Sequence, residues 1–154
     1  MSVKQFNVSY LPNDDRIIFR FNTIDNNEYI FWLTRRVTHF ILMSANQFIE
    51  KEYEKLTPSV ENVISEMHKS DTQEASFSRT YTGGAQYPIG GDAVLVIDVK
   101  CKMIKIEEQD IFSLDLVLPG GGNLNIRLAV PVMKMLILLL EELNIQAKWG
   151  NPVE

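Results

Sequence analysis

The residues that could carry chemistry are basic and aromatic, and two of them occupy an unusual position. Arg35 and Arg36 stand in the first turn of an expected helix, where the positive end of the helix dipole disfavours cations. There they could form an anion site with the exposed amide groups of that turn. The alternative is a structural ion pair with Asp14, Asp15, Asp25 or a glutamate from the other half of the chain.

A second candidate combines Arg20 with Trp32 on neighbouring expected strands. An exposed tryptophan beside an arginine can stack on a base or another planar ligand. The alternative is an amphipathic cross-strand pair, or a tryptophan buried in an oligomer contact. Further basic residues expected on the sheet surface could hold phosphates of a single-stranded nucleic acid; they are Arg16, Lys100, Lys102 and Arg127.

No residue pattern predicts catalysis. His39 and His68 are the only histidines, and neither has a metal-ligand spacing. Cys101 falls on the core side of an expected strand and is expected to be buried and inert. The glycine pairs lack the lysine and Ser/Thr of a phosphate-binding loop, so turn chemistry explains them better. We therefore expect no enzyme activity, no metal and no cofactor.

The first third of the chain shows two hydrophobic periods. Residues 4–11, 16–23 and 29–33 alternate between apolar and polar, with the turns "PNDD" and "DNN" between them, which predicts an antiparallel meander with one dry face. The period then changes to that of a long helix with Thr34 as its N-cap. The expected apolar stripe of this helix is Val37, Phe40, Ile41, Ala45, Phe48, Ile49, Tyr53 and Leu56.

The remaining chain contains a polar segment and a second set of elements. A shorter helix is expected over 57–70, and residues 71–91 form a linker rich in Ser, Thr and Gly. Its side chains Phe77, Arg79, Tyr81 and Tyr87 could form a lid over a ligand or simply anchor the linker. An apolar strand region over 93–105, two more strands and a helix over 131–144 complete the chain.

The two parts share a pattern at an offset of 95 residues, which lays Phe19 on Leu114 and Leu33 on Leu128 without a gap from about residue 6 to residue 42. The pattern predicts an α+β fold made of tandem duplicated βββα units, each with an antiparallel meander sheet packed on one face by a long helix. The units are a first copy with the short helix (1–70), the linker (71–91) and a second copy (92–154), together forming one compact domain.

A three-residue hairpin loop predicts the strand register and the polar face of each sheet. The opposed pairs would be Arg20–Trp32 and Phe21–Phe31 in the first copy, and Asp115–Arg127 and Leu116–Ile126 in the second. The polar face would carry Gln5, Asn7, Arg16, Arg20, Asn22 and Trp32 in one copy, and Lys100, Lys102, Ser113, Asp115, Asn123, Asn125 and Arg127 in the other. Both faces are more basic than the chain as a whole.

Composition argues against several classes of partner. The 154 residues are 45% hydrophobic, with a formal net charge of −5, so the chain has no global basic field for nucleic acid or anionic lipid. The apolar run 132–140 is shorter than the ~20 residues of a membrane span. The N-terminal ten residues lack a signal-peptide pattern, and one cysteine fits a reducing compartment. We expect a cytoplasmic protein that does not bind membranes.

The run "DRIIFRFNTIDNNEYIFWLTRR", residues 15–36, resembles a pattern in a family of small uncharacterised bacterial proteins. This resemblance implies a bacterial origin and no particular activity. The layout of a repeated meander plus helix is also similar to Whirly and Pur-repeat proteins, whose sheet faces bind single-stranded nucleic acid. The chain departs from that layout because its first copy has three expected strands instead of four and its net charge is negative.

These patterns favour a non-enzymatic interaction module that binds a protein partner or itself, as a homo-oligomer, through the polar sheet face. The first alternative is single-stranded nucleic-acid binding on the basic sheet face. The second is an anion or small-molecule site at the junction of the copies, covered by the linker.

Overall fold

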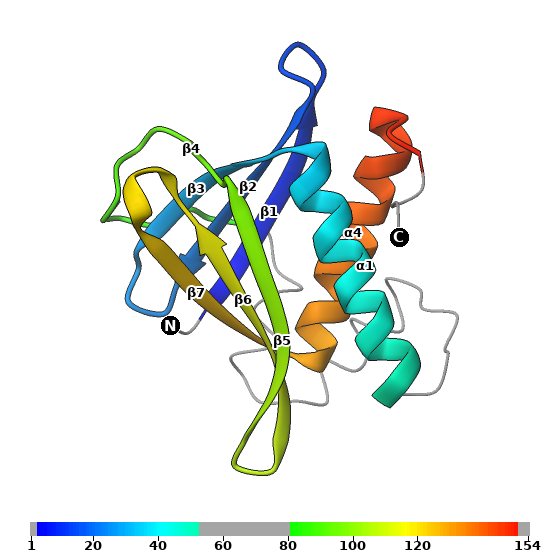
Figure 1. Cartoon of the computed structure of the whole chain (residues 1–154). Helices are drawn as coiled ribbons and strands as arrows, with labels where there is room; N and C mark the ends of the chain where they lie inside the picture. The colour runs from blue at the N-terminus through cyan, green and yellow to red at the C-terminus, as the bar shows by residue number, and fades with distance from the viewer. Residues whose placement is uncertain (1–2, 53–80, 151–154) are drawn as a thin grey trace.

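The computed structural model describes residues 3–52 and 81–150 and has an α+β fold (Figure 1). Within these residues the chain forms two β-sheets and two α-helices. The first sheet contains β1 (Val3–Leu11), β2 (Arg16–Thr23), β3 (Glu28–Leu33) and β4 (Val94–Leu95). The second contains β5 (Asp98–Ile106), β6 (Gln109–Val117) and β7 (Asn123–Ala129). The helices are α1 (Arg35–Glu52) and α4 (Val130–Ala147), and a short 3-10 helix, η2 (Pro119–Gly121), joins β6 to β7.

The strand order differs from the expected one at β4. The first sheet has the order β1-β2-β3-β4, and β4 pairs in parallel with β3. The second sheet is the antiparallel meander β5-β6-β7. The expected strand region over 93–105 is therefore split between the two sheets, because Val96 and Ile97 separate its first residues from β5. The expected short helix over 57–70 lies outside the described residues.

The dry face predicted for the meander is confirmed. Ile17, Phe19 and Phe21 of β2 are buried together with Phe31 and Leu33 of β3. Their aromatic rings pack closely, with 5.9 Å between the centroids of Phe21 and Phe31. Buried side chains of both sheets and both helices join in one hydrophobic core, which α1 and α4 line side by side (Figure 1).

Helix α1 begins where the sequence predicted. The Thr34 hydroxyl accepts a hydrogen bond from the Val37 amide at 3.3 Å, as an N-cap does. Of the predicted apolar stripe, Val37, Ile41 and Ala45 are fully buried, whereas the side chain of Phe40 is 40% exposed. The stripe members Tyr53 and Leu56 lie outside the described residues. Helix α1 packs mainly on β5 of the second sheet, and α4 packs on β1 of the first.

The predicted register is wrong by two residues in both hairpins. Phe19 is opposite Phe31 and Leu114 is opposite Ile126, because each three-residue loop begins one residue earlier than predicted. In the first hairpin the Thr23 amide donates to the Asn27 carbonyl oxygen at 2.9 Å, which makes residues 24–26 the loop. A slip of two residues preserves the face of every side chain, so the predicted faces hold although the opposed pairs change.

The changed register separates both polar pairs that the sequence predicted. Arg20 is opposite Ile30, and Trp32 is opposite Ile18, so Arg20 and Trp32 are diagonal neighbours on one face. In the second sheet Arg127 is opposite Ser113 instead of Asp115. The gapless alignment from residue 6 also fails on the first strands, because the β1–β2 turn spans residues 12–15 and the β5–β6 turn only 107–108.

Candidate ligand pocket on the first sheet

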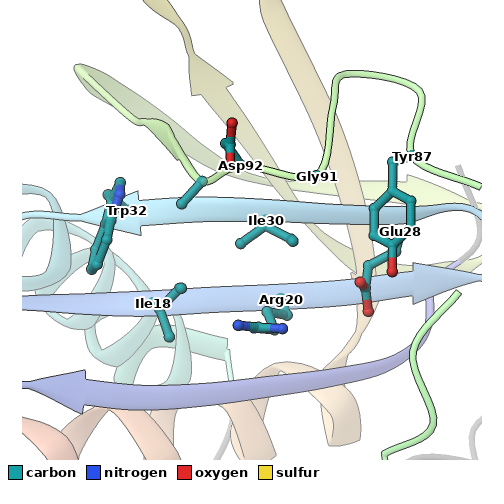
Figure 2. A pocket seen from close by; sticks show the side chains of 9 residues that line it. Ile18, Arg20, Glu28, Ile30, Trp32, Tyr87, Gly91 and Asp92 are labelled. Atoms are coloured by element: carbon teal, nitrogen blue, oxygen red, sulfur yellow. The ribbon is translucent and has the colours of Figure 1, made fainter.

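The segment before β4 is attached to β3 at two points and rises between them. A parallel bridge joins Asn27 to Gln86, and β4 places Val94 beside Phe31. Between the two attachment points the β3 side contains only residues 28–30, whereas the segment contains residues 87–93. The surplus chain, residues 87–93, forms a loop beside the sheet (Figure 2), which we call the arch.

The first attachment point is close-packed. The Glu28 amide donates to the Gln86 carbonyl oxygen at 2.7 Å, and the Ala85 amide donates to the Asn26 carbonyl oxygen at 2.8 Å. A Cβ atom on Gly84 would lie 2.8 Å from the Glu28 amide nitrogen, so only glycine allows this approach. The second point is fixed by a hydrogen bond of 3.0 Å from the Val96 amide to the Trp32 carbonyl oxygen.

A pocket of about 610 Å³ lies between the arch and the outer face of the first sheet, the face turned away from the core. Its volume is in the range of small-molecule sites. Figure 2 shows Trp32 at one end and Glu28 with Tyr87 at the other, with Asp92 on the arch above β3. The lining residues are Ile18, Arg20, Glu28, Ile30, Trp32, Tyr87, Gly91, Asp92 and Ala93.

Arg20 and Trp32 are the pocket's two most specific binding groups. Both are partly exposed. Within the described residues the Arg20 guanidinium has no ion pair or hydrogen bond, and the Trp32 indole has no hydrogen bond or ring partner. An arginine head group that lacks a protein acceptor can bind a carboxylate or phosphate oxygen, and the indole offers a flat apolar surface beside it.

Glu28 forms the polar end of the pocket and is already engaged. Its side chain is 3% exposed, and its carboxylate accepts a hydrogen bond of 2.5 Å from the Tyr81 hydroxyl. Burial and this hydrogen bond raise the pKa of Tyr81 far above its ordinary value. A hydrogen bond to Glu28 also raises the pKa of Tyr87. Both tyrosines therefore stay protonated and act as donors to Glu28.

A second polar contact fixes the chain beside Tyr81 to the edge of the sheet. The Gln5 side-chain oxygen accepts hydrogen bonds from the Asn22 amide at 3.2 Å and from the Thr82 backbone amide at 3.3 Å. The Asn22 side-chain oxygen is buried and has no hydrogen-bond partner within the described residues. Gln5 and Asn22 were expected on the polar face of the first sheet, yet both are buried, and Glu28 is buried as well.

The arginine pair lies outside the pocket lining. Arg36 forms an ion pair of 3.8 Å with Asp98 and donates a hydrogen bond to the Ile97 carbonyl oxygen. Arg35 lies close enough to Asp15 to contribute to lowering the pKa of that carboxyl, although hydrogen bonds from Tyr10 and then Trp149 contribute more. Both arginines thus face acids of the chain, and one of these, Asp15, was among the expected partners.

The other predicted binding residues are not brought to the pocket. Arg16 lies at the start of β2, four residues before Arg20, and is absent from the lining. Lys100, Lys102 and Arg127 belong to the second sheet and are exposed there. The structure therefore unites Arg20 with Trp32 and leaves the remaining basic residues elsewhere.

Sequence reasoning missed Glu28, Asp92, Ile18 and Ile30 as pocket residues. One signal was present, because Ile18 and Ile30 alternate with polar residues on the face expected to be wet. They are only 9% and 5% exposed, so these two side chains are buried although they lie on the polar face. Asp92 directly follows Gly90 and Gly91 and carried no such signal.

The groups that sequence reasoning excluded from catalysis have structural partners. The His39 Nε2 atom lies 2.8 Å from the Asn144 side-chain oxygen. Cys101 packs against the core, and burial raises the pKa of its thiol to about 12. In the described ranges, no group of three or more His, Cys, Asp or Glu side chains could hold a metal ion. No helix in the same ranges is long and apolar enough to cross a membrane.

Comparison with protein families, with curated proteins and with solved structures gave no match. The resemblance of residues 15–36 to small bacterial proteins therefore stays a prediction. Functional inference rests on the chemistry of the pocket itself.

Proposed function

We propose that the chain is a binding protein that takes a small molecule with an anionic group and an apolar or planar part into the pocket under the arch. The prediction was an anion or small-molecule site at the junction of the copies, covered by the linker; this proposal moves it to the outer face of the first sheet, beside residues 87–93. The observation that carries it is the Arg20 guanidinium, which lines a pocket of about 610 Å³ without an ion pair or hydrogen bond in the described part of the chain.

The arrangement around Arg20 favours a ligand in preference to a structural role. A partly buried guanidinium group can donate several charge-assisted hydrogen bonds to the oxygen atoms of a bound anion. Ile18 and Ile30 lower the exposure of this region to water, which strengthens such contacts. Trp32 would hold the apolar or planar part of the same ligand beside the anion.

Nucleic-acid binding is the weaker proposal for this surface. A phosphate chain needs several cations along its path, and the first-sheet pocket offers Arg20 together with the carboxylates of Glu28 and Asp92. Binding of a protein partner or self-association through the polar face also remains a proposal. The arch supplies four of the nine lining residues, so this part of the first-sheet surface is a concave pocket, which favours a small ligand.

We also propose that the fold arose by tandem duplication of a βββα unit. Equal geometry of the central hairpins supports this. Thr23 and Asn27 close one loop by an amide-to-carbonyl hydrogen bond of 2.9 Å, and Leu118 and Gly122 close the other at 2.8 Å. Thr23 and Leu118 are 95 residues apart, and so are Asn27 and Gly122, which is the offset of the sequence pattern. The two-residue difference between the first hairpins would then be a later change in loop length.

A ligand panel measured by thermal shift tests the binding proposal. The panel contains aromatic carboxylates, sugar phosphates, nucleotides, amino acids and short peptides. A ligand at a concentration of 100 times its Kd stabilises the protein by about 2.7 kcal/mol, so a true ligand raises the Tm clearly. We expect Arg20→Gln to weaken that ligand about tenfold or more, because a charge-assisted hydrogen bond is lost.

Arg16→Gln is the matched control, because Arg16 lies on the same strand and face but outside the pocket lining. It should leave the ligand affinity unchanged. Absence of any stabilising ligand, or equal effects of the two arginine variants, would contradict the proposal.

A further inference from the structure

We infer that the ligand of this pocket is a zwitterion the size of a short peptide, with a free carboxylate, a free ammonium group and apolar side chains between them. This inference rests on the proposed function and names its ligand class. Four features of the lining carry it: a cation and an anion without a protein partner in the described residues, a carboxylate whose oxygens accept protein hydrogen bonds, and an apolar middle.

The first step is to find which charged groups of the lining are not hydrogen-bonded to the protein itself. Glu28 accepts hydrogen bonds from tyrosine hydroxyls, so its carboxylate is satisfied by the protein. Arg20 and Asp92 have no ion pair or side-chain hydrogen bond within the described residues. Of the three charged side chains in the lining, Arg20 and Asp92 therefore keep their hydrogen-bonding capacity for a ligand, and they match a ligand with one charge of each sign.

The second step is the placement of these two charges. Arg20 projects from β2, whereas Asp92 belongs to the arch on the far side of β3 (Figure 2). They form no ion pair, so their charged atoms lie more than the 4.0 Å limit apart. A ligand that binds both must therefore carry its two charges on separate groups, and the ammonium and carboxylate groups of a dipeptide meet this condition.

The third step is the surface between the charges. Ile18, Ile30 and Trp32 line the same pocket, and they offer apolar contact area to the side chains of a peptide. A polyphosphate would meet two carboxylates and one guanidinium, whereas a zwitterion meets the opposite charge at each of its ends. The volume of about 610 Å³ accommodates two residues with large side chains.

Isothermal titration calorimetry with the full chain tests the inference with three related probes. They are the dipeptide Phe-Leu, its C-terminal amide and its N-acetyl derivative. Each modified probe lacks one charge, so we expect each to bind about tenfold or more weakly than Phe-Leu. Arg20→Gln should weaken Phe-Leu but not the amide, and Asp92→Asn should weaken Phe-Leu but not the N-acetyl derivative.

Asp14→Asn is the control for the second variant, because Asp14 lies in the β1–β2 turn outside the pocket lining. It should leave all three affinities unchanged. Free phenylalanine serves as the probe for charge separation and should bind more weakly than Phe-Leu. Equal binding of Phe-Leu and its N-acetyl derivative would overturn the inference, and so would equal effects of Asp92→Asn and Asp14→Asn.

The two levels of the proposal fail in different ways. If a nucleotide or an aromatic carboxylate binds in an Arg20-dependent manner while Phe-Leu does not, the ligand class is wrong and the proposed function stands. If no member of either set binds the unaltered chain, both are overturned.

Discussion

The outer faces of the two sheets use equivalent register positions in opposite ways. In the first sheet, Ile18 faces Trp32 and Arg20 faces Ile30, and all four line the pocket. In the second, the same places in the ladder hold Ser113, Asp115, Asn125 and Arg127. Here the Asn125 amide donates to Ser113 at 2.8 Å and to Asp115 at 2.6 Å, and Arg127 donates to Asn125 at 3.3 Å.

The difference shows what turns a sheet face into a binding site. Polar side chains that satisfy one another leave little binding capacity for a ligand. Arg20 lacks such a partner in the described part of the chain and lies in a pocket that also contains covered isoleucines. The arch provides one wall of this pocket, since four of the nine lining residues belong to it. The face of the second sheet keeps its lysines and Arg127 exposed.

Detachment of the arch from β3 should have the largest effect. Gly84→Val places side-chain atoms where a Cβ would already lie 2.8 Å from the Glu28 nitrogen and 2.9 Å from the Asn26 oxygen. We expect the attachment to β3 to be disrupted, with a loss of about 3 kcal/mol in the free energy of unfolding. The first-sheet face should then resemble the open face of the second. Urea denaturation and ligand titration measure the two consequences.

Gly122→Ala is the control for this prediction, because nothing lies within 4 Å of a Cβ at Gly122 and its φ of −75° suits any residue. It should change the free energy of unfolding by less than about 0.5 kcal/mol. Equal stability and ligand affinity of Gly84→Val and the unaltered chain would show that the arch does not depend on this close approach.

The next prediction tests which face of the second sheet is turned inward. Burial raises the pKa of Cys101 to about 12, so at pH 8 the folded chain contains far less thiolate than the unfolded chain. We expect a thiol reagent to modify the native protein about a hundredfold more slowly than the denatured protein. Because the folded pKa is the higher one, stability from this group is complete below the unfolded pKa and is lost as pH rises above it.

A cysteine on the opposite face provides the contrast. In a double variant that combines Cys101→Ala with Lys102→Cys, the new thiol lies on the exposed side of β5. It should react nearly as fast in the native protein as in the denatured protein. Slow reaction of this thiol together with fast reaction of Cys101 would reverse the assignment of the inner and outer faces.

The sequence predicted the faces of the strands well because alternation is a local property. Ile17, Phe19 and Phe21 are buried as their spacing required. The register was missed by two residues because it depends on which residue accepts a positive φ. Asn26 does so, with φ of 67°, and places the loop over residues 24–26. Because residues 26 and 27 are both asparagine, composition alone does not distinguish this loop from a loop over residues 25–27.

The site was predictable only in its sheet half. Arg20 and Trp32 could be recognised as partners from their residue types, and their shared face followed from alternation. Tyr87 was named as a possible lid residue, but neither it nor Asp92 could be assigned to this sheet face, because the chain that carries them is joined to β3 by backbone hydrogen bonds such as that from Glu28 to Gln86. Backbone pairing of this kind is independent of side-chain pattern. Only the isoleucines on the polar face indicated that some segment covers it.

The smallest effect concerns the ion pair that connects the start of α1 to the second sheet. Arg36 and Asp98 are 3.8 Å apart, and their side chains are 70% and 60% exposed. An exposed pair contributes little and is screened by salt, so Arg36→Ala should lower the free energy of unfolding by about 0.5 kcal/mol at low salt. Urea denaturation at 20 mM and 500 mM salt, where the difference should shrink at the higher concentration, measures this.

The same variant sharpens the contrast between a structural arginine and a binding one. Arg36→Ala should leave the affinity of every pocket ligand unchanged, since Arg36 lies outside the lining, whereas Arg20→Gln should weaken the ligand with a small effect on stability. If Arg36→Ala instead weakened an anionic ligand, the anion site would lie at the first turn of α1. The first-sheet pocket would then not be the site that distinguishes the two sheets.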